Sequence, residues 1–170
     1  MSKILMWVAQ EGFRDEELFE PQEAFRARGH IVDVVSHAAG TAVSKAGARL
    51  TVGALSCDEV SRYDAFLLVG GPGSMSLAQD VPLHHCIVAA RDAGLVVGAI
   101  CFSPNILAAA GVLDGRRASV WNGPGLLEQH GCRWERSDVC TDGDLVTANG
   151  PAASVAWAQA VLDLLERRTP

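Results

Sequence analysis

Short apolar segments alternate with longer amphipathic segments along most of the chain. The short segments are rich in valine, leucine and isoleucine, which is typical of buried strands; they are residues 3–9, 30–36, 65–69 and 95–100. The longer segments carry apolar residues at helical spacing, over 15–28, 83–93, 104–110 and 151–167. Strands that alternate with helices predict an α/β fold, in which a mostly parallel sheet is covered by helices on both faces.

The remaining segments predict smaller elements. Residues 41–55 alternate weakly between apolar and polar side chains, as a hairpin does, and residues 10–14 are expected to form a loop. Asp142-Gly143 favours a turn between two strand-like pieces of 139–148. A short strand is expected over 117–120 and a short helix over 125–130. Pro21 lies inside the helix predicted over 15–28, so that helix either begins near Pro21 or is kinked there.

Length and composition indicate one ordered domain over residues 1–170. Hydrophobic residues make up 49% of the chain and charged residues 20%, values that exclude intrinsic disorder. The formal charge of −6 counts against a nucleic-acid partner. We expect no membrane partner, because the longest nearly uncharged stretch, 93–114, is interrupted by Ser103, Pro104 and Asn105. The start of the chain lacks a signal-peptide pattern, so we expect a cytoplasmic protein.

Five cysteines are present, and none forms a Cys-x-x-Cys pair. This spacing makes a metal site improbable, and no cofactor is expected. In the cytoplasm thiols are kept reduced. We therefore expect Cys57, Cys86, Cys132 and Cys140 to be small, buried, apolar residues.

Ligands of open parallel sheets bind beyond the carboxyl ends of the strands. The first predicted strand brings residues 10–17 to that edge, the third brings 70–74, and the fourth brings Cys101. An acidic segment, a glycine-rich loop and one cysteine are therefore predicted to meet there.

The segment from Gly98 to Pro104 carries the most chemical information. A strand ends, a sharp turn holds Cys101, and a helix begins, which is the arrangement of a nucleophile elbow. The positive end of the following helix would favour the thiolate form of Cys101. The alternative is a buried cysteine that only ends an apolar strand, and the pattern leaves both open.

Two neighbouring features bear on that cysteine. The loop Gly70-Gly71-Pro72-Gly73 matches neither a P-loop nor Gly-x-Gly-x-x-Gly; it provides either an oxyanion site from backbone amides or a plain turn. The acidic residues between Asp15 and Glu20 suit an exposed helix start. One of them could instead face inward as a protonated acid beside the thiol.

The chain resembles the ThiJ/PfpI superfamily, which also contains the parkinsonism-linked deglycase and relates to class I glutamine amidotransferase domains. The resemblance covers nearly the full length and rests on the motifs 17–21 (ELFEP), 63–71 (YDAFLLVGG), 99–104 (AICFSP), 109–117 and 149–151 (NGP). It implies a three-layer, flavodoxin-like α/β sandwich that forms a homodimer or larger homo-oligomer. It further implies that Cys101 is the reactive thiol, that Glu17 is its protonated partner, and that the amides of Gly71 and Phe102 line the oxyanion site.

The histidines that serve related sites are missing. Many hydrolase-like members of the superfamily carry histidine directly after the cysteine, where this chain has Phe102. The deglycase-like branch places it shortly after the next strand, where this chain has Trp121 or Asn122. We expect Trp121, Asn122 and Ser103 to belong to the pocket, with Phe102 and Trp121 making its mouth apolar.

The leading hypothesis is a cysteine-dependent enzyme that acts on a small carbonyl or amide compound, as a glyoxalase, deglycase, amidase or peptidase does. The alternative is an oxidative-stress or redox-sensing protein, whose elbow cysteine is oxidised to sulfinate and which needs no base. A third possibility is a site that has drifted and retains only binding or assembly.

Overall fold

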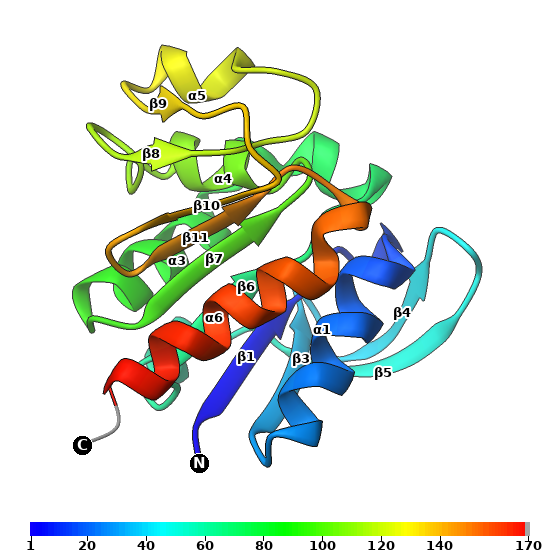
Figure 1. The fold of residues 1–170 in the computed structure, drawn as a ribbon. Helices are drawn as coiled ribbons and strands as arrows, with labels where there is room; N and C mark the ends of the chain where they lie inside the picture. Colours follow the sequence, from blue (N-terminus) through cyan, green and yellow to red (C-terminus); the bar gives the residue numbers. More distant parts are fainter. Residues whose placement is uncertain (169–170) are drawn as a thin grey trace.

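The computed structural model describes residues 1–168, which form one nine-stranded sheet with helices on both faces (Figure 1). The sheet order is β10-β11-β7-β6-β1-β3-β5-β4-β2. Five parallel strands make up its centre: β1 (Lys3–Trp7), β3 (Ile31–Ser36), β6 (Ala65–Leu68), β7 (Val96–Ile100) and β11 (Leu145–Ala148). Antiparallel pairs lie toward the edges, β10 (Val139–Asp142) with β11, and β4 (Gly40–Ser44) with β5 (Arg49–Ala54).

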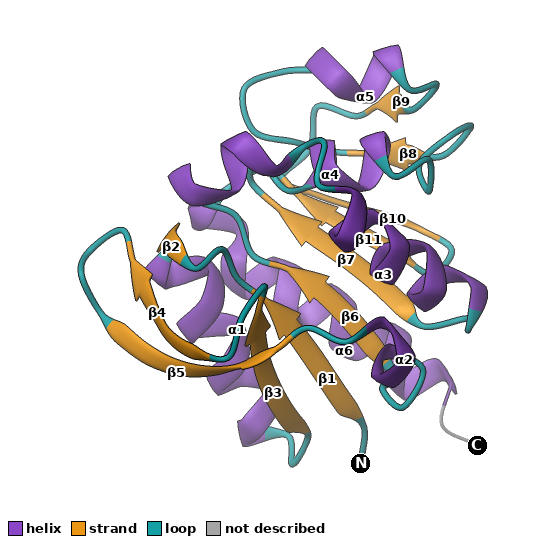
Figure 2. Cartoon of the chain, turned by 180° about the vertical axis from the view of Figure 1, so that it is seen from behind, coloured by secondary structure: helices purple, strands orange, loops and turns teal. Residues whose placement is uncertain are grey.

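The helices form the two outer layers. Helices α1 (Asp15–Ala27) and α6 (Ser154–Arg168) cover one face. On the other face lie α2 (Cys57–Val60), α3 (Val81–Asp92) and α4 (Pro104–Ala109), which Figure 2 shows from that side. The predicted three-layer α/β sandwich with a mostly parallel sheet is confirmed.

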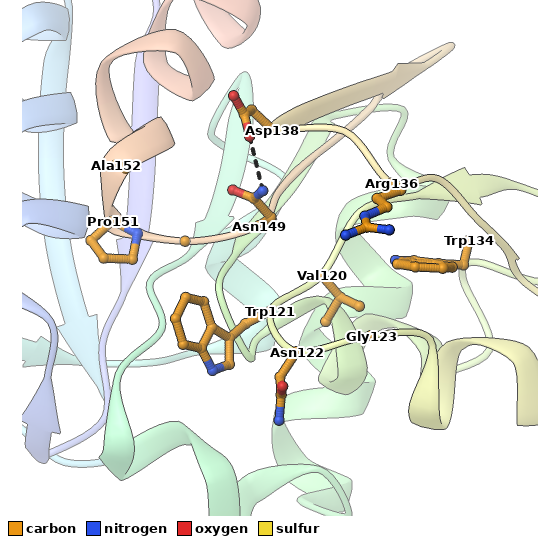
Figure 3. Close-up of a pocket in the computed structure, with 11 residues that line it drawn as sticks. Val120, Trp121, Asn122, Gly123, Trp134, Arg136, Asp138, Asn149, Pro151 and Ala152 are labelled. Carbon is orange, nitrogen blue, oxygen red and sulfur yellow. Dashed lines mark hydrogen bonds between the residues drawn. The ribbon is translucent and has the colours of Figure 1, made fainter.

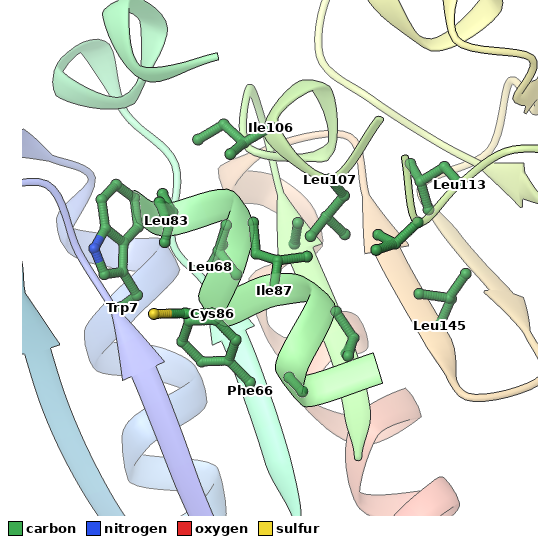
Figure 4. Close-up of a cluster of buried hydrophobic side chains, with 14 of the residues drawn as sticks. Trp7, Phe66, Leu68, Leu83, Cys86, Ile87, Ile106, Leu107, Leu113 and Leu145 are labelled. Carbon is green, nitrogen blue, oxygen red and sulfur yellow. The ribbon is translucent and has the colours of Figure 1, made fainter. Parts of the chain in front are cut away.

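The strand sequence explains the two cores. Successive strand side chains point to opposite faces, so a strand covered on both sides must be apolar throughout. In β6, Phe66 and Leu68 join the core under α3 and α4, whereas Ala65 and Leu67 join the core under α1 and α6. Figure 4 shows Phe66 and Leu68 against Ile87 of α3.

A smaller unit lies at one end of the molecule (Figure 1). It consists of β8 (Arg117–Ala118), β9 (Arg133–Trp134) and α5 (Gly125–Gln129). The Ser119 amide joins it to the main sheet by donating to Thr147 Oγ1 at 2.9 Å.

Several short elements differ from the sequence-based expectations. The loop expected over 10–14 contains β2 (Glu11–Phe13), which pairs with β4. The 3₁₀ helices η1 (Pro72–Leu77) and η2 (Pro151–Ala153) were not predicted as such. Pro21 lies inside α1, which begins six residues before it at Asp15. These elements are short and depend on tertiary partners, so local periodicity does not reveal them.

The prediction that Cys57 and Cys86 are reduced, buried residues is wrong in two respects: the two are bonded to each other, and Cys57 is only partly buried, whereas Cys86 is buried as predicted. Cys57 and Cys86 form a disulfide that joins the start of α2 to α3. They stand 29 residues apart in the sequence, and only the packing of α2 against α3 brings them together. Cys132 and Cys140 are free and buried, as predicted, and Cys101 is free.

Within residues 1–168, no cluster of three or more His, Cys, Asp or Glu side chains is arranged to hold a metal ion. No helix in that range is long and apolar enough to cross a membrane.

Candidate active site around Cys101

The three segments predicted to converge do meet at the carboxyl ends of β1, β6 and β7. The amide of Arg14 donates to the carbonyl oxygen of Gly70 at 3.0 Å, and the amide of Gly70 donates to Glu17 Oε2 at 2.9 Å. A Cβ atom on Gly70 would lie 2.6 Å from the Ile100 carbonyl oxygen and 2.7 Å from both Cys101 Cβ and Glu17 Oε2. Only glycine therefore fits where the three segments touch.

Cys101 occupies a sharp turn between β7 and α4. Its φ angle is +63°, a left-handed conformation that is uncommon for a residue with a side chain. The turn is held by backbone bonds on both sides: the Cys101 amide donates to Ala148 O, and the Trp121 amide donates to Cys101 O, each at 2.9 Å. Strained backbone that is fixed by its surroundings is a common feature of active sites.

Glu17 points into the protein from the first turns of α1. It is fully buried, although Asp15, Glu16 and Glu20 on the same helix are partly or fully exposed. Its Oε1 atom meets no nitrogen or oxygen donor among residues 1–168, and the Cys101 thiol lies within hydrogen-bonding range of the carboxyl group. Burial raises the pKa of Glu17 to about 7, against the opposing effects of the Cys101 and Gly70 hydrogen bonds. This carboxyl group therefore exchanges a proton near neutral pH.

The thiol does not have the low pKa expected from the helix that follows it. Burial raises the pKa of Cys101 to about 12, and the charge of Glu17 acts in the same direction. Amide donors from Gly71 and Phe102 to the sulfur oppose these effects but are weaker. The expected thiolate preference is therefore wrong for the resting site, because desolvation outweighs the amide donors and α4 is only six residues long.

The amides of Gly71 and Phe102 converge on the Cys101 sulfur from two different loops. Gly71 has a φ of +112°, and a Cβ atom there would lie 2.6 Å from both Arg14 N and Gly12 O. The loop after β6 thus packs tightly on the 11–14 segment, with its amide directed at the sulfur. Two donors at this position match the requirement of an oxyanion site.

A cavity of about 220 Å³ opens beside the sulfur. It is lined by Arg14, Lys45, Gly71, Pro72, Met75, Cys101, Phe102, Trp121 and Pro151. Phe102 and Trp121 line this cavity as expected, but its lining is not purely apolar, because the cationic side chains of Arg14 and Lys45 also line it. All five histidines of the chain lie within residues 1–168, and none lines this cavity.

A second cavity of about 480 Å³ also has Trp121 among its lining residues (Figure 3). Trp134, Arg136, Asp138 and Asn149 contribute to its walls. Trp121 and Pro151 line both cavities, and the Trp121 side chain is 55% exposed. The space at Cys101 and the larger cavity therefore have Trp121 and Pro151 in common.

The remaining predicted pocket residues lie elsewhere. Ser103 is fully buried, and its hydroxyl donates to Val69 O at 2.9 Å, so it fixes the turn and lines neither of these cavities. Asn122 lines the second cavity and not the one at Cys101. The site residues Arg14 and Lys45 were missed. Arg14 lies in the segment predicted to reach this edge, whereas Lys45 arrives from the β4–β5 hairpin without a sequence signal.

The mostly parallel sheet, with a cysteine at the turn after β7 next to a buried carboxyl group, places the protein in a class of α/β proteins with an elbow cysteine. Comparison with known proteins identifies the family within this class. The family model described as the DJ-1/PfpI family matches residues 2–164, and the chain belongs to this family. It is similar to Deglycase PH1704 of Pyrococcus horikoshii, with 31% identity over 96% of this chain and 99% of that protein. It is also similar to General stress protein 18 of Bacillus subtilis, with 34% identity over 98% of this chain and 100% of that protein.

Solved structures agree with this assignment. The crystal structure of a ThiJ/PfpI domain protein from Brachyspira murdochii superposes with a TM-score of 0.93 and 28% identity, covering 98% of both chains.

Proposed function

We propose that this protein is a cysteine-dependent enzyme of the glyoxalase or deglycase type, in which Cys101 attacks a small carbonyl compound. The observation that carries the proposal is the buried pair of Glu17 and Cys101, set at a strained turn with two amides directed at the sulfur. The names of its relatives, which include deglycases and a glutathione-independent glyoxalase, support the same reaction class.

The first step would use the residues as follows. The thiol proton moves to Glu17 while the sulfur attacks an aldehyde carbon, so that a C–S bond forms and the carbonyl π electrons pass to oxygen. The amides of Gly71 and Phe102 stabilise the negative charge on that oxygen. Glu17 then returns the proton to the oxygen, which leaves a hemithioacetal.

For a dicarbonyl such as methylglyoxal, two further changes complete the reaction. One proton moves from the hemithioacetal carbon to the neighbouring ketone carbon, and the hydroxyl proton moves from the hemithioacetal oxygen to the former ketone oxygen. These two transfers turn the hemithioacetal into a thioester, which one water hydrolyses. Lactate leaves and the Cys101 thiol is restored. The fully buried Glu17 is the group placed to carry these protons, because no histidine lines the cavity.

The test is methylglyoxal consumption with lactate formation, measured for the wild type, Cys101→Ser and Glu17→Gln. Cys132→Ser is the matched control, since Cys132 is a buried free cysteine outside both cavities. We expect loss of activity in Cys101→Ser, and a fall of about 10²–10⁴-fold in Glu17→Gln, the usual contribution of a general acid or base. Equal rates for the wild type and Cys101→Ser would remove Cys101 from the chemistry.

A second function is favoured by the missing histidine. Oxidation by peroxide needs no base from the protein: each of two peroxide molecules transfers one oxygen to sulfur and leaves as water, giving sulfenate and then sulfinate. A protonated Glu17 would donate a hydrogen bond to the new oxygen. Intact mass after mild peroxide, with the other thiols blocked, tests this; no oxygen addition at Cys101 would exclude it.

The family resemblance also implies a homodimer or larger homo-oligomer. Light scattering coupled to size-exclusion chromatography measures the molar mass in solution. We expect the mass of a homodimer or larger homo-oligomer, and the mass of a monomer would contradict the proposal.

A further inference from the structure

The disulfide between Cys57 and Cys86 lies in a different part of the molecule from Cys101. It joins α2 to α3, on the sheet face that Figure 2 shows in front. A cavity of about 270 Å³ borders it, lined by both cysteines together with His37, His85 and four apolar residues. This cavity shares no lining residue with the one at Cys101. Any chemistry here is therefore separate from the proposed active site.

The two sulfur atoms differ sharply in access. Cys86 is 2% exposed and packs in the core with Trp7 and Phe66, as Figure 4 shows. Cys57 is partly exposed, and its sulfur lies 3.8 Å from the carbonyl oxygen of Pro82 at the cavity. A dissolved reagent should therefore reach Cys57 far more readily than Cys86, which lines the same cavity but is almost fully buried.

Apolar packing between α2 and α3 also brings this pair together. The Cα atoms of Cys57 and Cys86 are 4.5 Å apart, within the range that a disulfide requires. Val60 of α2 and Leu83 of α3 are fully buried in the same core cluster. Because this apolar packing does not involve the bond, we expect the two sulfurs to stay adjacent after reduction, so that the bond can form again without a large backbone movement.

Proton acceptors share the cavity. His37 Nε2 lies 2.7 Å from Asp80 Oδ2, and its ring packs edge-on against Trp7 with the centroids 5.5 Å apart. His85 contributes a second imidazole. Because the thiolate and not the thiol is the nucleophile, an imidazole that lines the same cavity as Cys57 offers a place for the thiol proton.

We propose that Cys57 and Cys86 form a thiol–disulfide exchange site for low-molecular-weight disulfides, in which Cys57 attacks and Cys86 resolves. The Cys57 thiolate attacks one sulfur of the incoming disulfide, forms a mixed disulfide and releases the first small thiol. Cys86 then attacks the Cys57 sulfur, closes the protein disulfide and releases the second small thiol. The protein dithiol is oxidised by two electrons, and the small disulfide is reduced to two thiols.

The experiment starts from protein that has been fully reduced, freed of reductant and kept without oxygen. All variants carry Cys101→Ser, so that the elbow thiol cannot contribute and the outcome does not depend on the proposed function. Oxidised glutathione is the probe. Intact mass and peptide mapping locate each adduct, and released glutathione is counted.

With both cysteines present, we expect the Cys57–Cys86 bond and no retained glutathione. Cys86→Ser should retain one glutathione on Cys57, because nothing resolves the mixed disulfide. Cys57→Ser should remain unmodified, because Cys86 is only 2% exposed, and Cys132→Ser should behave as the parent does. Circular dichroism confirms that each variant is folded, and Cys86→Ala replaces Cys86→Ser if the hydroxyl prevents folding. Adducts that fall on Cys132 or Cys140 in the folded Cys86 variant, or a reduced parent that never closes the bond, would overturn the proposal.

Discussion

The raised pKa of Glu17 makes protein stability depend on pH in a way that one substitution removes. Burial raises this pKa from 4.5 to about 7. A carboxyl group whose folded pKa lies above its unfolded pKa favours folding most when it is protonated. Its contribution is fully present below pH 4.5 and is lost as the pH rises through 7. Glu17→Gln keeps the shape and an oxygen acceptor for the Gly70 amide, but carries no charge at any pH.

The size of the effect follows from the shift. The rise of the Glu17 pKa from 4.5 to about 7 corresponds to about 3 kcal/mol between pH 4.5 and pH 8. Because Glu17 is fully buried, solvent does not screen this interaction. Cys101 titrates well above this window, at about 12, so it does not enter the comparison. Relative to the wild type, Glu17→Gln should therefore gain about 3 kcal/mol of stability on going from pH 4.5 to pH 8.

Urea unfolding at the two pH values measures this difference of differences. Other titrating groups are common to both proteins and cancel. Glu20→Gln serves as the matched control, because Glu20 is exposed on the same helix and its variant should track the wild type at both pH values. An equal stability difference between Glu17→Gln and the wild type at pH 4.5 and pH 8 would refute the reasoning. Glu17 would then titrate as it does in the unfolded chain and could not hold a proton near neutral pH.

Three further changes test the site and the scaffold. Gly70→Ala places a Cβ atom 2.6–2.7 Å from three groups of the site. It should lower the free energy of unfolding in urea by about 1–3 kcal/mol and abolish methylglyoxal consumption. Gly53→Ala is the control, because its Cβ atom would lie no closer than 3.4 Å to a neighbouring atom, and it should have neither effect. Trp121→Ala should change the free energy of unfolding by less than about 1 kcal/mol, because Trp121 is 55% exposed. It should raise the KM for methylglyoxal several-fold. An unchanged KM would show that Trp121 does not contact the substrate. Cys57 and Cys86 lie 29 residues apart in the sequence, so reducing their bond should lower the free energy of unfolding by about 3–4 kcal/mol, because the unfolded chain gains conformational entropy. Equal denaturation midpoints with and without reductant would contradict this.

The sequence predicts the sheet and its helices because the apolar runs of the strands and the apolar spacing of the helices follow from which side chains are buried in the core. It also contains a signal for Glu17, since positions 17, 21 and 25 follow one another at four-residue spacing and all lie on the buried face of α1. Amphipathic spacing thus places this carboxyl group beside Pro21 and Phe25, on the side that faces the core. Its exposed neighbours Glu16 and Glu20 fall outside that stripe.

Other features could not be read from local pattern. The direction of the Cys101 pKa shift depends on a balance between burial and two amide donors, and burial can be known only after the chain has folded. The Cys57–Cys86 bond depends on how α2 packs against α3, and no spacing rule anticipates it. Lys45 reaches the cavity at Cys101 because a hairpin curls back toward β2, which is itself only three residues long.

A thiol with a pKa of about 12 looks unsuited to nucleophilic attack, but the pair must be considered together. At pH values between the two pKa values, about 7 for Glu17 and about 12 for Cys101, the pair together holds one proton and one negative charge. Moving that proton from sulfur to the carboxyl group creates no additional charge, so it avoids the desolvation cost that keeps each pKa high. The Gly71 and Phe102 amides favour the state with charge on sulfur. Burial therefore suppresses a permanently reactive thiolate, and in the proposed mechanism proton transfer within the pair generates the nucleophile when a carbonyl carbon lies against it.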